Sequence, residues 1–299
     1  TGFYPINDFY GVFNGKDNEI RNIYINNTTL DIVGLFQKVY GTVNSLGITG
    51  TITGNEYAGS IAGENKGTIK NCYNNGTMLQ AVFWASNKVG GIAGRNEGTV
   101  TNCYNIATLS GNEQIGGIVA DNDNGIITNC YNSGVINSSE SRVGGIVVNN
   151  RGTVTNCYNS ATVTSLGGYA GGIAGNNSNT SINGVEYTGT IENCYNTGAI
   201  TGYSAAGGIA GGNYAGKIVK SYNEGAITAT YYDANVGGIV GDNEVIINNC
   251  YNSGDVVGKS YTGGITGSNA GTITNCYNTT TVKSDSNSYD NETFIGGIT

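Results

Sequence analysis

Residues 90–105 read GGIAGRNEGTVTNCYN, and the chain repeats this stretch almost from end to end. Close copies read GGIVADNDNGIITNCYN at 116–132 and GGIVVNNRGTVTNCYN at 144–159. A unit that recurs every ~20–50 residues is the signature of a stacked repeat architecture. The first glycine of the unit lies at Gly34, Gly59, Gly90, Gly116, Gly144, Gly171, Gly207, Gly237, Gly263 and Gly296.

Within one unit the apolar residues follow the pattern of short strands. The segments around Ile92, around Val100 and ending at Leu109 are rich in Ile, Val and Thr and are bounded by Gly and Asn. Blades of a WD-type propeller need about 40–45 residues, which is longer than this repeat. We therefore predict an all-β fold, a parallel right-handed β-solenoid (β-helix) of about nine to ten coils, each of roughly 27 residues with three short strands.

The composition excludes several functional classes. The 299 residues include 50 Gly, one Pro and no His, and the net charge is −8. Collagen needs far more Pro, and a nucleic-acid-binding protein needs a surplus of Lys and Arg. Sites that depend on imidazole are excluded, and there is no apolar run of about 18 residues that would span a membrane. We expect neither a nucleic-acid partner nor membrane insertion of this chain.

Three parts of the chain depart from the regular repeat. Residues 1–32 lack the full unit, and we expect them to form an N-terminal cap on a solenoid that spans residues 33–299. The chain stops inside a unit, so we expect the natural solenoid to continue. An insertion near 178–189 places Asn183 and Gly184 between two β-like arms, which is typical of a hairpin turn.

Two columns of the repeat consist of Asn in every full unit. In stacked coils equivalent residues lie above one another, so each column becomes a ladder along the rod. We interpret both as structural corners, because Asn tolerates the left-handed conformation and its amide can hydrogen-bond to adjacent coils. A polar binding groove is the alternative. The columns are Asn65, Asn96, Asn122, Asn150, Asn177, Asn213, Asn243 and Asn269, and Asn74, Asn105, Asn132, Asn159, Asn196, Asn223, Asn252 and Asn278.

A column of Cys precedes a column of Tyr. Seven cysteines cannot all pair internally, and no CxxC spacing indicates zinc. We favour a stack of small buried thiols, with partial disulfides between coils as the alternative. Tyr would then face outward, either as a ladder that stiffens the sheet or as a stripe that docks a sugar chain or protein; the opposite orientation stays open. The columns are Cys72, Cys103, Cys130, Cys157, Cys194, Cys250 and Cys276, with Ser221 in one place, and Tyr73, Tyr104, Tyr131, Tyr158, Tyr195, Tyr222, Tyr251 and Tyr277.

Charged residues also follow the stacking. Glu64, Arg95 and Asp121 occupy equivalent positions of successive units, so we predict that Arg95 lies within salt-bridge reach of Glu64 or Asp121. Opposite signs mostly meet between coils, although Glu97 beside Asp123 is a mismatch. We expect these pairs to be exposed, so that each adds only about 0–1 kcal/mol to stability. Their main effect would be to favour the correct register between adjacent coils.

The loops that link the units carry aromatic residues. All of them leave the same edge of the rod, where insertions are tolerated and binding residues concentrate. Phe83, Trp84, Tyr203, Tyr231 and Tyr232 are therefore candidate ligand contacts for a glycan or protein. The alternative is that Phe83 and Trp84 fold back to cover the rod.

The repeat resembles the GLUG family of bacterial surface proteins. The residues that carry this resemblance are GGIAGRNEGTVTNCYN at 90–105 and its copies, together with GVFNGKDNEIRNIYIN at 11–26 and VGLF at 33–36. The resemblance implies a secreted or cell-wall-attached β-solenoid. Similar repeats flank the catalytic region of some immunoglobulin A metallopeptidases, but that activity does not transfer, because the H-E-x-x-H zinc motif needs His.

We predict a non-catalytic extracellular stalk or adhesin segment that displays its aromatic loops to a host glycan or protein. The alternative is an accessory repeat module of a larger secreted enzyme. A glycan-active enzyme would need converging carboxylates, for which Asp121 and Asp123 near Arg95 or Arg151 form the local cluster. No cofactor is expected; calcium at Asp121 and Asp123, or around 17–19 with Asp17 and Glu19, is the alternative, although the acidic density falls short of a calcium loop.

Overall fold

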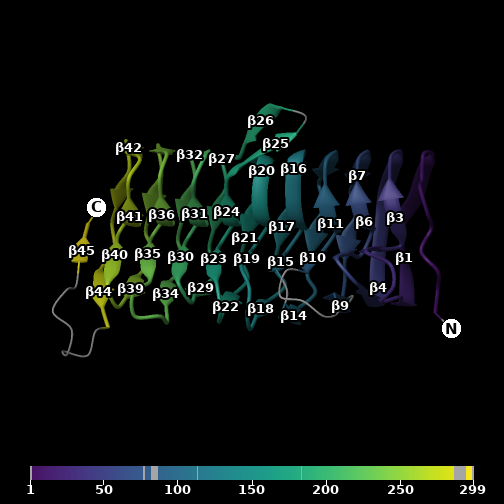
Figure 1. The fold of residues 1–299 in the computed structure, drawn as a ribbon, viewed down its shortest axis with the longest axis horizontal. Coiled ribbons are helices and arrows are strands. Elements are labelled where there is room, and N and C mark those ends of the chain that lie inside the picture. The colour runs from purple at the N-terminus through teal and green to yellow at the C-terminus, as the bar shows by residue number, and fades with distance from the viewer. Residues whose placement is uncertain are drawn as a thin grey trace.

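The computed structural model describes residues 2–76, 78–81, 87–112, 114–182, 184–285 and 294–297. In these residues every regular element is a β-strand, and no helix is long and apolar enough to cross a bilayer. The strands stack in parallel into a rod that has the N-terminus at one end and the C-terminus at the other (Figure 1). The predicted all-β solenoid of about ten coils of roughly 27 residues is confirmed.

One coil contains five short strands where the sequence predicts three. The Gly-Gly corner divides the segment around Ile92 into two strands, and Asn102, which is left-handed with φ 52°, separates two more. Each strand pairs in parallel with its equivalent in the next coil, so Lys88 lies beside Gln114. In residues 88–111 the strands are β10 (Lys88–Gly90), β11 (Ala93–Asn96), β12 (Thr99–Thr101), β13 (Tyr104–Asn105) and β14 (Leu109–Gly111).

Three parallel sheets run along the rod. The ten-stranded sheet, here called the glycine wall, contains β10. Its other strands are β2 (Ile32–Val33), β5 (Tyr57–Gly59), β15 (Gln114–Gly116), β19 (Val143–Gly144), β23 (Tyr169–Gly171), β30 (Ala205–Gly207), β35 (Asn235–Gly237), β40 (Tyr261–Gly263) and β45 (Phe294–Gly296). The seven-stranded sheet adds to β14 the strands β18 (Ile136–Ser138), β22 (Val163–Ser165), β29 (Ile200–Gly202), β34 (Ile227–Ala229), β39 (Val256–Gly258) and β44 (Val282–Ser284).

The third sheet has 26 strands and includes β11, β12 and β13. Its other strands are β1 (Val12–Asn26), β3 (Phe36–Val39), β4 (Thr42–Gly54), β6 (Ala62–Asn65), β7 (Thr68–Lys70), β8 (Tyr73–Asn74), β9 (Met78–Ala81), β16 (Val119–Thr128), β17 (Tyr131–Asn132), β20 (Val147–Thr155), β21 (Tyr158–Asn159), β24 (Ala174–Asn177), β27 (Thr190–Glu192), β28 (Tyr195–Asn196), β31 (Ala210–Asn213), β32 (Lys217–Val219), β33 (Tyr222–Asn223), β36 (Val240–Asn243), β37 (Ile246–Asn248), β38 (Tyr251–Asn252), β41 (Thr266–Asn269), β42 (Thr272–Thr274) and β43 (Tyr277–Asn278).

The inward faces of the sheets enclose one apolar core. In the coil of residues 88–111, Val89, Ile92, Val100, Cys103 and Leu109 are all buried, and the neighbouring coils repeat this set. Burying one Val, Leu or Ile side chain stabilises the fold by about 1.5–3 kcal/mol. A single coil would leave the edges of this core open to water, so stacking is what makes the core complete.

The Asn residues that come directly after the Tyr column in the sequence form a ladder of buried side chains through the core. Asn105 Nδ2 donates to Asn132 Oδ1 at 2.7 Å, and Asn132 Nδ2 donates to Asn159 Oδ1 at 2.8 Å. The amide of Asn132 donates a further hydrogen bond to the carbonyl of Gly134 at 2.9 Å. Every polar group of the Asn132 side chain is therefore satisfied inside the protein.

The other Asn column forms a second ladder, in which Asn96 Nδ2 donates to Asn122 Oδ1 at 2.8 Å. It starts at Asn65, whose Oδ1 has no partner because Val39 occupies the equivalent position of the preceding coil. Neither ladder supplies the left-handed corners that we predicted for it. Those corners belong to a different column, which precedes Cys and comprises Asn71, Asn102, Asn129, Asn156, Asn193, Asn249 and Asn275, with Lys220 in one place.

In the units that begin between Gly90 and Gly263, the second glycine packs against the ladder formed by the Asn residues that come directly after the Tyr column. A Cβ added at Gly117 would lie 2.7 Å from Asn132 Cγ and would overlap the carbonyl oxygen of Gly145. A Cβ at Gly145 would lie 2.6 Å from Asn159 Cγ. Glycine thus recurs where the backbone of one wall approaches both the next coil and a buried amide.

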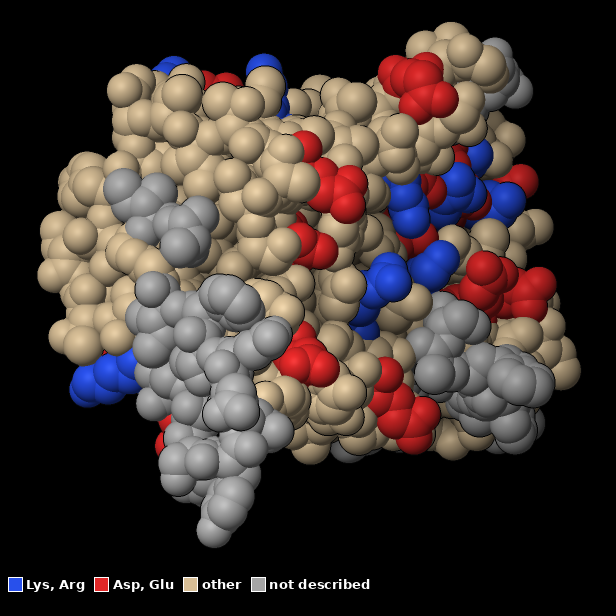
Figure 2. All heavy atoms as spheres, turned by 60° about the vertical axis from the view of Figure 1, so that its left-hand side comes forward, with Lys and Arg blue, Asp and Glu red and all other residues tan. Residues whose placement is uncertain are grey.

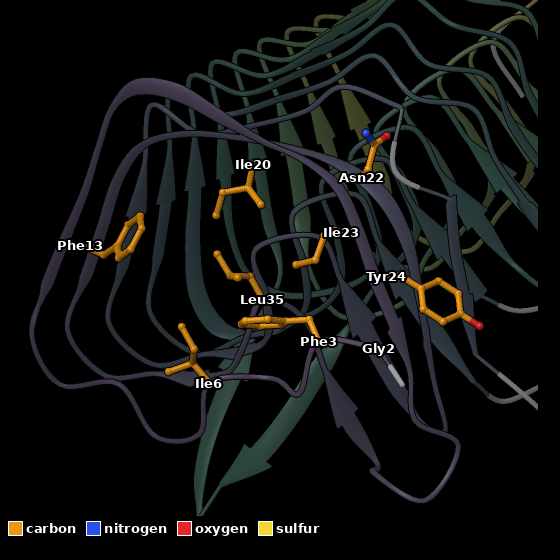
Figure 3. A pocket seen from close by; sticks show the side chains of 9 residues that line it. All are labelled: Gly2, Phe3, Ile6, Phe13, Ile20, Asn22, Ile23, Tyr24 and Leu35. Atoms are coloured by element: carbon orange, nitrogen blue, oxygen red, sulfur yellow. The ribbon is translucent and has the colours of Figure 1, made fainter.

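Residues 2–26 add a further coil at the N-terminal end. Strand β1 pairs in parallel with β4, and Ile6 and Phe9 form isolated bridges to β3. An apolar cavity of about 540 Å³ lies at the end of this coil. Figure 3 shows Phe13 and Leu35 pointing into it.

One hairpin projects from the rod, where the sequence predicts one (Figure 1). Strands β25 (Asn179–Ile182) and β26 (Val185–Thr188) pair antiparallel, with Ile182 opposite Val185. Gly184, directly before Val185, has φ 79°, a conformation that suits a tight hairpin turn, whereas Asn183 lies outside the described residues.

Candidate functional site

The main cluster of charged side chains lies on the outward face of the glycine wall and of the adjoining strands β6, β11, β16 and β20. Figure 2 shows Lys and Arg side chains gathered in one patch, with Asp and Glu among them. Five of the 13 Lys and Arg residues belong to this patch. We call it the charged seam and define it as Lys38, Tyr57, Glu64, Lys66, Lys88, Arg95, Glu97, Asp121, Asp123, Asn149 and Arg151.

Arg95 joins carboxylates from three successive coils. Its Nη1 lies 3.6 Å from Glu64 Oε1, which confirms the predicted contact. Its Nε lies 2.8 Å from Asp123 Oδ2 and its Nη2 lies 3.0 Å from Glu97 Oε1. Arg95 therefore pairs with both of the like charges, Glu97 and Asp123, that the sequence places side by side. The carboxylates are not exposed as predicted: Glu64 is 3% and Asp123 is 6% exposed, because long cationic side chains lie over them.

Asp121 is the most enclosed carboxylate of the charged seam, with 1% of its surface exposed. Lys88 Nζ lies 2.8 Å from its Oδ2, and Asn149 Nδ2 donates to its Oδ1 at 2.8 Å. Burial is the largest single influence on Lys88 and disfavours its charge, but the attraction and hydrogen bond of Asp121, together with those of Tyr57, outweigh it, so the pKa of Lys88 is raised. Burial and the charge of Asp121 also raise the pKa of Tyr57.

The charged seam is better suited to joining coils than to binding a cation. Ca²⁺ prefers six to eight oxygen ligands, whereas oxygens of Asp121 and Asp123 already face ammonium and guanidinium groups. At the other position considered as an alternative for calcium, Glu19 accepts hydrogen bonds from Arg21 at 2.8 Å and from Asn75 at 2.9 Å. Across the described ranges, no three His, Cys, Asp or Glu side chains converge in a way that could hold a metal.

The Cys column faces the core and the Tyr column faces outward. All seven cysteines are free thiols, and Cys103, Cys130 and Cys157 are fully buried. Tyr104 and Tyr131 stack with ring centroids 4.9 Å apart and an interplanar angle of 6°. Because each ring covers the face of the next, the column presents edges and hydroxyl groups. The stack comprises Tyr73, Tyr104, Tyr131, Tyr158, Tyr195, Tyr222, Tyr251 and Tyr277.

The tyrosine stack predicts a loss of stability at alkaline pH. Burial, together with neighbouring ring hydroxyls, raises the pKa of Tyr104, Tyr131 and Tyr222. A group whose pKa is raised by folding stabilises the fold fully below its ordinary pKa of about 10, and this contribution is lost as the pH rises through the folded-state value. We therefore expect the contribution of the tyrosine stack to the free energy of unfolding to be level between about pH 7 and 9 and to fall above about pH 10.

Urea unfolding at several pH values, combined with an absorbance titration of tyrosinate, measures this effect. The folded protein should titrate at higher pH than the same protein in urea. The Tyr131→Phe variant removes one titrating hydroxyl from the middle of the stack, and its alkaline loss of stability should be smaller. A folded-state titration midpoint at or below that of the unfolded chain would contradict the prediction.

The candidate aromatic contacts divide into two groups. Phe83 and Trp84 lie outside the described residues. Tyr203, Tyr231 and Tyr232 lie on loops between the seven-stranded sheet and the glycine wall, and they are 37%, 42% and 38% exposed. The rings of Tyr203 and Tyr231 have centroids 4.9 Å apart, with an interplanar angle of 34°. We call these three residues the tyrosine edge.

A polar cavity of about 420 Å³ adjoins the tyrosine edge. The two are joined through the backbone, because the N–H of Tyr203 donates to the carbonyl of Gly168, which lines the cavity, at 2.9 Å. Gln114, Arg142 and Tyr169 line it from successive strands or strand entries of the glycine wall.

Sequence reasoning missed this cavity. The signal was present, because Gln114, Arg142 and Tyr169 each lie two residues before the first glycine of their unit and therefore form one column. The column was overlooked because its residue type changes from coil to coil.

Comparison with known proteins supports the repeat and the fold. Residues 111–137 match the model of the GLUG motif. The chain is also similar to the crystal structure of a proposed immunoglobulin A1 protease from Bacteroides ovatus, with a TM-score of 0.50 and 20% identity over 84% of this chain and 83% of that chain. At this identity the likeness concerns the fold alone. No curated protein sequence matches. The chain is thus a β-solenoid that carries the GLUG motif.

Proposed function

We propose that this chain is a non-catalytic extracellular module of a bacterial cell-surface protein, and that it displays the tyrosine edge to a host glycan or protein. The observation that carries the proposal is the exposure of Tyr203 and Tyr231 on loops of a rigid rod, directly beside a polar cavity. Aromatic rings with a polar rim suit the binding of sugars and of protein surfaces.

The rest of the rod supports a mechanical and presenting role. Its buried amides, thiols and charged groups largely bond to the adjacent coils, as Asn132 does to Asn159 and Arg95 does to Asp123. In the charged seam, Asp121 and Asp123 are engaged by cations from neighbouring coils, an arrangement that supports cohesion of the rod rather than acid–base chemistry.

The alternative is that the chain serves as an accessory repeat module of a larger secreted enzyme. The observation in its favour is the fold shared with the proposed Bacteroides ovatus protease. In that case the tyrosine edge would contact the substrate of the enzyme or another domain, and deletion of the module would alter the activity of the whole protein.

A glycan array probed with this chain tests the proposal. We expect the wild type to bind a subset of oligosaccharides, and we expect the Tyr203→Ala/Tyr231→Ala variant to lose about tenfold or more in affinity, because aromatic contacts dominate such interfaces. Tyr24→Ala is the matched control, since Tyr24 is also exposed but lies on the N-terminal coil. Failure of the wild type to bind any glycan or host surface protein, or equal losses for both variants, would contradict the proposal.

A further inference from the structure

The polar cavity is lined by an arginine that is not part of the charged seam. Each Lys or Arg of the charged seam lies within 4 Å of a carboxylate. Arg142, by contrast, forms no ion pair with any described residue. Its guanidinium lies 5.4 Å from the centroid of the Tyr169 ring, and the side chain is exposed. This aromatic contact holds the cation at the cavity without neutralising it.

A second donor lies in the same wall. Gln114 lines the cavity, and its Oε1 accepts a hydrogen bond from Asn149 Nδ2 at 3.0 Å. With the oxygen engaged, the amide nitrogen of Gln114 is the group left to donate. A guanidinium and an amide nitrogen together form a donor set for a carboxylate, which a guanidinium binds through two parallel hydrogen bonds.

The surroundings favour a sugar as the carrier of that carboxylate. A volume of about 420 Å³ is within the usual range for a small-molecule site. Ser204 lines the cavity, and Tyr203 next to it begins the tyrosine edge. A ligand whose carboxylate is bound at Arg142 would therefore meet a hydroxyl group and aromatic rings beside it. A pyranose ring carries both the hydroxyl groups and the apolar C–H faces that such a surface matches.

We propose that the cavity binds the carboxylate of an acidic sugar at Arg142, and that the glycan continues across Tyr203 and Tyr231. This inference rests on the proposed glycan-binding function and specifies its ligand class. Glu140 also lines the cavity, and its charge opposes an anion there. Removing the charge of Arg142 should therefore weaken the binding of an acidic sugar, and removing the charge of Glu140 should strengthen it.

Calorimetry with a purified hexuronic acid oligosaccharide and a neutral oligosaccharide of equal length tests the proposal. The wild type should bind the acidic sugar more tightly, and added salt should reduce the preference. Arg142→Gln should weaken acidic binding by about tenfold or more and leave neutral binding unchanged, and Arg142→Lys should fall in between. Glu140→Gln should strengthen acidic binding. Lys220→Gln, at an exposed ion pair with Glu192, is the control that should change neither.

The outcomes separate this inference from the proposed function. Equal affinity for acidic and neutral sugars, or an Arg142→Gln variant that binds the acidic sugar like the wild type, would overturn the acidic-sugar site while leaving a glycan-binding tyrosine edge. An acidic peptide that binds at Arg142 more tightly than the sugar would assign the carboxylate to a protein partner and overturn the sugar. Absence of binding to any glycan would overturn the acidic-sugar site, and absence of binding to any glycan or host surface protein would overturn both.

Discussion

The Asn132→Ala variant should unfold with a free energy about 3–5 kcal/mol lower than that of the wild type. Asn132 is fully buried, accepts a hydrogen bond from Asn105 and donates to Asn159 and to the carbonyl of Gly134. Its removal leaves the Asn159 oxygen and the Gly134 carbonyl without these donors, and each unsatisfied buried group costs ~1–3 kcal/mol. The ladder is also interrupted in the middle, so hydrogen bonds on either side lose mutual polarisation.

Asn137→Ala in the same coil is the matched control. Asn137 lies on β18 and is exposed, so its loss should change stability by no more than about 0.5 kcal/mol. Urea unfolding followed by circular dichroism measures both variants under one set of conditions. Similar urea midpoints for the two variants would show that the buried ladder contributes no more than an exposed amide does.

The Gly117→Ala variant is expected to lose about 3 kcal/mol or more, the upper end for an added buried methyl group. The new Cβ would lie 2.7 Å from Asn132 Cγ and would overlap the carbonyl oxygen of Gly145 in the next coil. Neither neighbour can move away freely, because one is part of the Asn ladder and the other is backbone of the glycine wall. The coils on both sides must therefore shift to accept one methyl group.

Gly11→Ala tests whether the position, rather than the residue type, causes the loss. A Cβ at Gly11 would meet the ring of Phe9 at 3.5 Å, an ordinary van der Waals distance. Thermal unfolding should show a large fall in melting temperature for Gly117→Ala and little change for Gly11→Ala. A melting temperature for Gly117→Ala equal to that of Gly11→Ala would refute the packing argument; failure of Gly117→Ala alone to fold would support it.

Much of the fold was predictable because the repeat constrains it many times over. Each copy of the unit places Ile92, Val100 or their equivalents at the same spacing, and a stack of coils is the arrangement that buries all of them together. The same register argument predicted the contact between Arg95 and Glu64, since residues at equivalent positions must become neighbours. The number of strands was less predictable, because the corner at Asn102 depends on a local backbone angle.

The candidate site was less accessible to sequence reasoning. Tyr203 and Tyr231 could be singled out because exposed aromatic residues in variable loops are conspicuous. Arg142 and Gln114 could not, since nothing in the sequence distinguishes an arginine that neutralises a carboxylate from one that lines a cavity. That distinction depends on which side chains of different columns meet outside the rod.

The sequence by itself determined the period, the parallel stacking and the ladders, because a repeated residue in a solenoid must lie above its own copy. The tertiary structure decided how different columns meet. It placed Gly117 against Asn132, buried Asp121 beneath Lys88, and left Arg142 without an acidic partner among the described residues. The physical reason is that stacking relates equivalent residues along the rod axis, whereas contacts between columns depend on the angles of the corners within each coil, which the repeat does not specify.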